Sequence, residues 1–128
     1  MLLKILPLAL AAISVGGCAT IPRVNEDGSS EARLGQRVDL GGPRVTPLRV
    51  LEDSRCPMEA RCVWAGRVRM EILVETSRGK QVRELASDKP IAVADGQLEL
   101  LGVMPPRSTQ RAIAPKDYRF ALKFSGGF

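Results

Sequence analysis

An alternation of apolar and charged residues over residues 67–75 constrains the fold of this chain more than any other feature. Positions 68, 70, 72 and 74 are Val, Met, Ile and Val, and most positions between them are Arg or Glu. A period of two residues is typical of a β-strand with one buried face, whereas an amphipathic helix repeats every 3.6 residues or so. The alternation therefore predicts a strand that directs these four apolar side chains into a core.

Turn signals place hairpins on both sides of this pattern. Ser77-Arg78-Gly79-Lys80 predicts a turn that leads to a returning strand at residues 81–85. Asp95-Gly96 predicts a second hairpin, between strands at 91–93 and 98–103.

The same period continues at both ends of the domain. Strands are predicted at 37–40, at 45–51 and at 118–124, and the last of these places its larger side chains on one face: Tyr118, Phe120, Leu122 and Phe124. No stretch has a helical repeat. The chain is therefore predicted to be all-β, a small antiparallel β-sandwich or barrel of about seven short strands.

The first seventeen residues have the composition of a signal peptide. Lys4 supplies a positive charge, and residues 5–15 form an apolar stretch that is too short to span a bilayer comfortably. Val15-Gly16-Gly17-Cys18 resembles the lipobox of bacterial lipoproteins, which implies cleavage before Cys18 and lipidation of that cysteine. Ala19 follows, where an aspartate would imply retention at the inner membrane, so the resemblance implies anchoring at the outer membrane. The alternative is a secreted protein that is cut near Gly17.

Three segments follow from this pattern: a signal peptide at 1–17, the lipidated cysteine with a flexible polar tether at 18–33, and a β domain at 34–128. Removing 17 of the 128 residues leaves 111, enough for one domain. The formal net charge of +5 falls to about +4, because the removed segment contains Lys4 and no acidic residue. This modest basic excess suits either solvated strand faces or contact with an anionic envelope polymer.

The cysteine count predicts one disulfide. Lipidation of Cys18 would leave only Cys56 and Cys62 of the three cysteines, and an exported protein meets an oxidising compartment, so these two should pair. Closing so short a ring should stabilise the domain by about 2 kcal/mol.

The residues around this pair resemble a signature of small exported bacterial proteins of uncharacterised function. The signature is Asp53-Ser54-Arg55-Cys56-Pro57, four further residues, and then Cys62-Val63-Trp64-Ala65-Gly66. The resemblance implies an exported, disulfide-bonded β domain and brings no activity with it. From the residues themselves, Trp64 is expected to lie against the disulfide and seal one end of the core.

Two roles are predicted for the ring that Cys56 and Cys62 close: a structural role and a role in binding. As scaffold, it would close one end of the domain. As binding site, it would project Arg55, Met58, Glu59 and Arg61 from a preorganised loop towards an envelope protein.

Several function classes have little support. The chain has no histidine, which removes the usual general base and the commonest metal ligand, and its cysteine pair lacks the C-x-x-C redox spacing. No catalytic residue, metal site or cofactor is predicted. Nucleic acid is not an expected partner, because no basic run is interleaved with aromatic residues.

The sequence thus predicts a lipoprotein of the bacterial envelope, anchored at the outer membrane through lipid on Cys18 and facing the periplasm. Its role would be binding or structural support without catalysis. The alternatives are a secreted, inhibitor-like binding module that uses the Cys56–Cys62 loop, and a small hydrolase.

Overall fold

The computed structural model describes residues 11–13, 16–17, 25–26 and 28–126. Within these residues eight strands form two four-stranded antiparallel sheets, and the only helix is a short 3-10 turn, η1 (Pro115–Asp117). The prediction of a small all-β sandwich is confirmed. Most of the predicted signal peptide, and the predicted lipidation site Cys18, lie outside the described residues.

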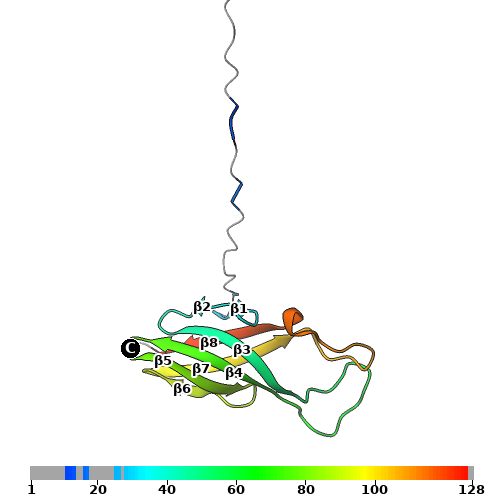
Figure 1. Cartoon of the computed structure of the whole chain (residues 1–128). Coiled ribbons are helices and arrows are strands. Elements are labelled where there is room, and N and C mark those ends of the chain that lie inside the picture. The colour runs from blue at the N-terminus through cyan, green and yellow to red at the C-terminus, as the bar shows by residue number, and fades with distance from the viewer. Residues whose placement is uncertain (1–10, 14–15, 18–24, 27, 127–128) are drawn as a thin grey trace, which may run out of the picture.

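The two sheets are assembled from strands that are far apart in the chain (Figure 1). Sheet A has the strand order β1-β8-β7-β6, and sheet B has the order β2-β3-β4-β5. The strands are β1 (Ser30–Ala32), β2 (Val38–Asp39), β3 (Arg44–Asp53), β4 (Val68–Thr76), β5 (Gly79–Ala86), β6 (Ile91–Val93), β7 (Gly96–Met104) and β8 (Arg119–Ser125).

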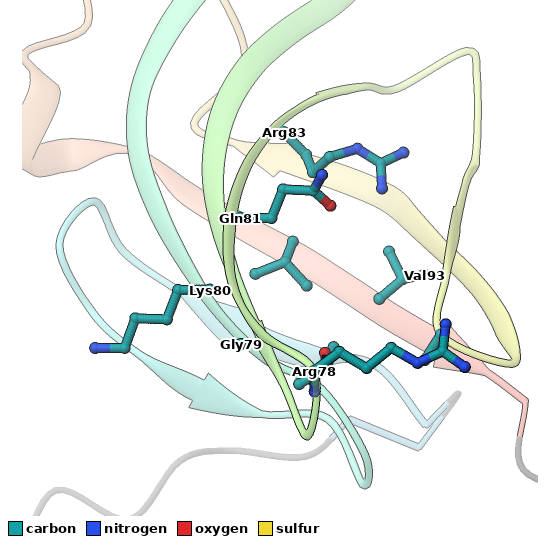
Figure 2. Close-up of a pocket in the computed structure, with 9 residues that line it drawn as sticks. Arg78, Gly79, Lys80, Gln81, Arg83 and Val93 are labelled. Atoms are coloured by element: carbon teal, nitrogen blue, oxygen red, sulfur yellow. Dashed lines mark hydrogen bonds between the residues drawn. The ribbon is translucent and has the colours of Figure 1, made fainter.

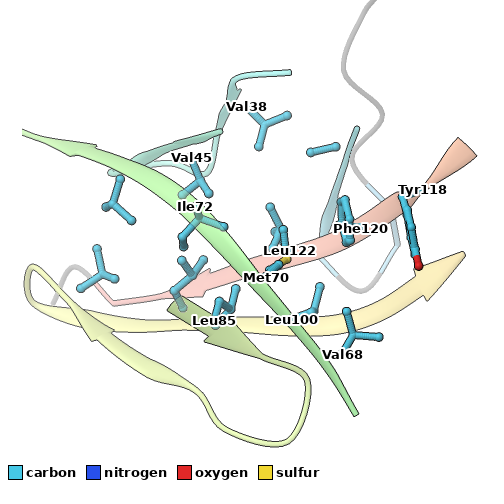
Figure 3. Close-up of a cluster of buried hydrophobic side chains, with 14 residues drawn as sticks. Val38, Val45, Val68, Met70, Ile72, Leu85, Leu100, Tyr118, Phe120 and Leu122 are labelled. Atoms are coloured by element: carbon cyan, nitrogen blue, oxygen red, sulfur yellow. The ribbon is translucent and has the colours of Figure 1, made fainter. Parts of the chain in front are cut away.

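The core lies between the sheets. The four alternating apolar positions of β4 (68, 70, 72 and 74) are buried as predicted, and they face the buried residues of β7 and β8 (Figure 3). Phe120 and Leu122 of β8 are completely buried, and the ring of Tyr118 stacks on that of Phe120 at a centroid distance of 5.6 Å. The alternating pattern therefore identified the core faces of both strands.

Both predicted hairpins are present. The β4–β5 turn consists of Ser77 and Arg78, followed by Gly79 at a φ of 118°. The β6–β7 turn lies one residue earlier than the Asp95-Gly96 signal suggested: it consists of Ala94 and Asp95, and Gly96 already pairs with Val93. A side chain on residue 96 would collide with the backbone of Ser125, so glycine is needed there for close packing against the end of β8.

The tether prediction of 18–33 is wrong at its end. Ser30–Ala32 forms β1, which pairs with β8, and the side chains of Ser29 and Ala32 are completely buried. These residues are too few and too polar to show a periodic pattern, and the edge of β8 supplies their hydrogen-bond partners. The domain therefore starts before residue 34, and the structure has one strand more than predicted.

Strand β3 departs from simple alternation. Its pairing with β4 shifts register after Pro47 and again after Val50. Each shift rotates the following side chains relative to the sheet. Leu48 and Leu51 are the residues without a partner at the two shifts, and both are exposed, whereas the sequence predicts one continuous strand at 45–51.

Candidate functional site

The connection between β3 and β4, residues 54–67, contains the predicted cysteine pair and is called here the cysteine loop. Cys56 and Cys62 form a disulfide with their Cα atoms 5.8 Å apart, so the predicted pairing is confirmed. The cysteine loop and the segment 105–114, called the companion loop, extend together beyond the same end of the sandwich (Figure 1).

A partly buried ion pair anchors the start of the cysteine loop. Nε and Nη2 of Arg55 each donate to one carboxylate oxygen of Asp53, both at 2.9 Å, and the hydroxyl of Tyr118 donates to Asp53 Oδ2 at 2.9 Å. A bidentate arginine–carboxylate pair of this kind fixes both position and orientation. These contacts attach the loop to the residue that precedes β8.

The same arginine also holds the end of β7. Nη1 of Arg55 donates to the carbonyl of Val103 at 2.7 Å, and Nη2 donates to that of Pro105 at 3.0 Å. Arg107 in turn donates to the carbonyl of Arg55 at 2.7 Å. The side chain of Arg55 is only 21% exposed, so the expectation that it projects towards a partner is wrong. The side chain of Arg55 instead lies against the domain, because it donates hydrogen bonds to two carbonyl groups about fifty residues away in the sequence.

These contacts change the ionisation of the acidic groups. Burial raises the pKa of Tyr118 to about 12, with a further contribution from its hydrogen bond to Asp53. Burial disfavours ionisation of Asp53, but the hydrogen bonds from Arg55 and Tyr118 and the charge of Arg55 together lower its pKa below the usual value. Asp53 is therefore a carboxylate and Tyr118 a neutral phenol at neutral pH.

Glu59 joins the cysteine loop to the companion loop. Ser108 Oγ donates to Glu59 Oε1 at 2.5 Å, and the backbone N–H of Thr109 donates to Oε2 at 3.0 Å. The hydrogen bond from Ser108 lowers the pKa of Glu59, as does that from Thr109. The N–H of Met58 donates to the carbonyl of Arg107 at 3.0 Å. The carboxylate of Glu59 thus has a structural use, which the sequence did not indicate.

The end of the cysteine loop is closed by Ser54 and Gly66. Ser54 exchanges backbone and side-chain hydrogen bonds with Arg67 at 2.9–3.1 Å. Gly66 packs directly on this backbone, and a Cβ there would collide with the carbonyl of Ser54. Glycine at this position is required by close approach of two chain segments.

Four of the exposed side chains of the cysteine loop are called here the exposed tip: Met58, Arg61, Val63 and Trp64. Val63 is 99% exposed, Met58 65% and Trp64 61%. The prediction that Trp64 seals one end of the core is wrong, because most of its ring faces solvent; its indole N–H donates to the carbonyl of Ser54 at 3.3 Å. Sequence reasoning therefore identified Met58 and Arg61 as exposed and missed Val63 and Trp64. The run Val63-Trp64-Ala65 carried a signal, since consecutive apolar residues in a loop are difficult to bury together.

Both carboxylates at the end of β3 accept hydrogen bonds from arginines. Both oxygens of Asp53 accept hydrogen bonds from Arg55, and the adjacent Glu52 lies on the other face of β3, where it accepts from Arg67 and Arg69. Among the described residues, no group of three potential metal ligands of the His, Cys, Asp or Glu type is present. No helix in the described part of the chain has the length and apolarity to cross a membrane.

Comparisons with protein-family models, with curated protein sequences and with solved structures find no match to this chain.

Proposed function

We propose that this protein is a binding protein of the bacterial envelope, anchored through lipid on Cys18 to the outer membrane and facing the periplasm. It contacts a partner protein through the exposed tip of its cysteine loop. The observation that carries the proposal is the exposure of Met58, Val63 and Trp64 on a loop that is otherwise held rigidly.

Rigidity makes the exposed tip a favourable binding surface. The disulfide, the Asp53–Arg55 pair and the Glu59 contacts fix the loop before any partner arrives. Less conformational entropy is then lost on binding. Tryptophan and arginine are the residues most often found at energetic hot spots, and the exposed tip offers Trp64 and Arg61.

The envelope location is supported by the N-terminal sequence and by the disulfide. Val15-Gly16-Gly17-Cys18 is the lipobox-like segment, and disulfides persist in oxidising compartments.

The second candidate function is an inhibitor-like activity of the cysteine loop. A protruding loop that is closed by a disulfide and carries an exposed apolar tip has the shape needed to enter the cleft of an enzyme.

The test is in-cell photo-crosslinking of the full-length protein with the photoreactive residue at position 63. The expected result is one dominant protein product, which is lost when Trp64→Ala is added. A probe at position 82 is the matched control, because Val82 is also exposed but lies on β5, in the other hairpin of sheet B. Diffuse products of equal yield from both positions would contradict the proposal. A dominant product that is an envelope enzyme, inhibited by the purified protein, would favour the second candidate.

A further inference from the structure

A cavity of about 380 Å³ opens between the β4–β5 and β6–β7 hairpins, away from the Cys56–Cys62 disulfide. Strand β5 pairs only with β4, and β6 pairs only with β7, so each is an edge strand of its sheet. The two layers of the sandwich are therefore open to solvent along this side. β6 has only three residues and covers little of the inner face of β5.

Polar side chains occupy the core-facing positions of β5 at this opening. Gln81 pairs with Val74 and Arg83 pairs with Ile72, and residues paired directly across a sheet share one face. Val74 and Ile72 both face the core, so Gln81 and Arg83 are directed inward as well. Figure 2 shows Arg78, Gln81 and Arg83 extending from the hairpin on the side of Val93, whereas Lys80 points away.

Among the described residues, the two guanidinium groups at this cavity, those of Arg78 and Arg83, have no carboxylate partner. In the part of the chain that the structure describes, neither Arg78 nor Arg83 forms an ion pair. Arg83 donates once, to the carbonyl of Ala92 at 3.2 Å. By contrast, Arg49 and Arg69 of the same sheet each pair with glutamates. The charges of Arg49 and Arg69 are thus paired with carboxylates, whereas the two arginines at this opening carry positive charge that no described carboxylate neutralises.

We propose that this cavity binds a phosphate monoester group. Two unpaired guanidinium groups match a phosphate monoester, which carries a charge of about −1.5 to −2 at neutral pH, better than a singly charged carboxylate or phosphodiester. Gln81 adds an amide donor, and Val74 and Val93 supply apolar contact for the carbon atoms next to the phosphate. The same chemistry is present in a small organic phosphate, in the terminal phosphate of a lipid and in inorganic phosphate.

The test is isothermal titration of the full-length protein at low ionic strength with glycerol 3-phosphate, inorganic phosphate and dimethyl phosphate. Glycerol 3-phosphate should bind saturably, and affinity should fall between pH 7 and pH 5 as the phosphate gains a proton with a pKa of about 6. Binding of the singly charged dimethyl phosphate with equal affinity would overturn the proposal. If inorganic phosphate bound as tightly as glycerol 3-phosphate, the apolar contact assigned to Val74 and Val93 would contribute nothing, and the assignment to a monoester would be overturned.

Matched variants separate a built site from general electrostatic attraction. Arg78→Gln should weaken glycerol 3-phosphate binding by about tenfold, which corresponds to the loss of one charge-assisted hydrogen bond. Lys116→Gln removes one positive charge from η1, which does not line this cavity, and should change affinity by less than about twofold. Equal losses in both variants would overturn the proposal.

A second pair of measurements guards against effects on folding or solubility. An inward charge on an edge strand also opposes edge-to-edge aggregation. Arg83→Gln should therefore be compared with the wild type for oligomeric state as well as for binding. Aggregation of this variant without any phosphate binding by the wild type would assign the arginines to that protective role instead.

Binding to vesicles that contain phosphatidic acid, compared with binding to phosphatidylglycerol vesicles, would distinguish a lipid source of the phosphate monoester from a soluble one.

Discussion

At the scale of single residues, Asp53 connects three parts of the chain that are distant in sequence. Its carboxylate accepts from Arg55 in the cysteine loop and from Tyr118 before β8, and Arg55 extends the contact to the end of β7. Removing one partner of such a buried pair leaves the other without its hydrogen bonds, which costs more than the pair contributes on its own. This one carboxylate therefore contributes to the position of the loop, together with the disulfide and the Glu59 contacts.

The titration of Tyr118 tests the arrangement directly, because the chain has a single tyrosine. Phenolate absorbance in the folded protein should rise at a pKa of about 12. The raised pKa means that the contribution of Tyr118 to stability is complete below pH 10 or so and is lost as the pH rises towards 12. Circular dichroism at each pH would show whether the protein is still folded where the absorbance changes.

Asp53→Asn should lower the pKa of Tyr118, because the variant removes the negative charge beside the phenol, although burial keeps the pKa above its ordinary value. Glu71→Gln, which removes an exposed carboxylate from sheet B, is the control and should leave the titration unchanged. An unaltered phenol titration in Asp53→Asn would contradict the assigned hydrogen bond. For Asp53 the pH dependence is the reverse, because its pKa is lowered in the folded protein. The contribution of Asp53 to stability is present above its ordinary pKa and is lost as the pH falls through the lower pKa of the folded state.

At the scale of elements, the sequence predicts strands well where one face is buried continuously. Strand β4 alternates without interruption and matches its prediction closely. Strand β1 was missed because its burial depends on pairing with β8, ninety or so residues later. The two register shifts in β3, at which Leu48 and Leu51 are unpaired and exposed, were not predicted, because they are set by the partner strand and not by the local pattern.

Gly66 shows how closely two elements approach at the base of the cysteine loop. Gly66→Ala should lower the free energy of unfolding by about 1–3 kcal/mol, since the added methyl group must displace the backbone of Ser54. Gly102→Ala is the matched control: its nearest neighbour would be the Ala121 side chain at 4.0 Å, an ordinary contact. Urea denaturation of the two variants gives the comparison. Equal stability of Gly66→Ala and the wild type would mean that the loop base is less closely packed than described.

At the scale of the whole molecule, the proposed anchor and the exposed tip define how the protein would meet a partner. The first strand begins at Ser30, so the chain between Cys18 and the domain is shorter than the tether predicted from composition. The N–H of Asn25 already donates to the carbonyl of Ser29 at 2.7 Å, and the seven residues from Cys18 to Asn25 can span at most about 25 Å. The domain would therefore stay near the membrane surface, with the exposed tip free to turn towards the periplasm.

Cys18→Ser should move the full-length protein from the membrane fraction to the soluble periplasmic fraction, because no lipid could then be attached. Cys56→Ser is the matched control, since it removes a different cysteine and should leave the protein with the membranes. Fractionation followed by immunodetection measures both. Retention of Cys18→Ser in the membrane fraction would contradict the lipid anchor.

The sequence by itself determined the all-β class, the core faces of β4 and β8, and the Cys56–Cys62 pairing, because periodicity and cysteine count are local or compositional properties. Only the tertiary structure decided the direction of individual loop side chains. Arg55 turns inward because the carbonyl groups of Val103 and Pro105 lie beside it, and Trp64 stays exposed because Gly66 and Ser54 already close the loop base. The cavity beside Arg78 and Arg83 likewise exists only because two edge strands from different sheets end side by side, a relation that no local pattern encodes.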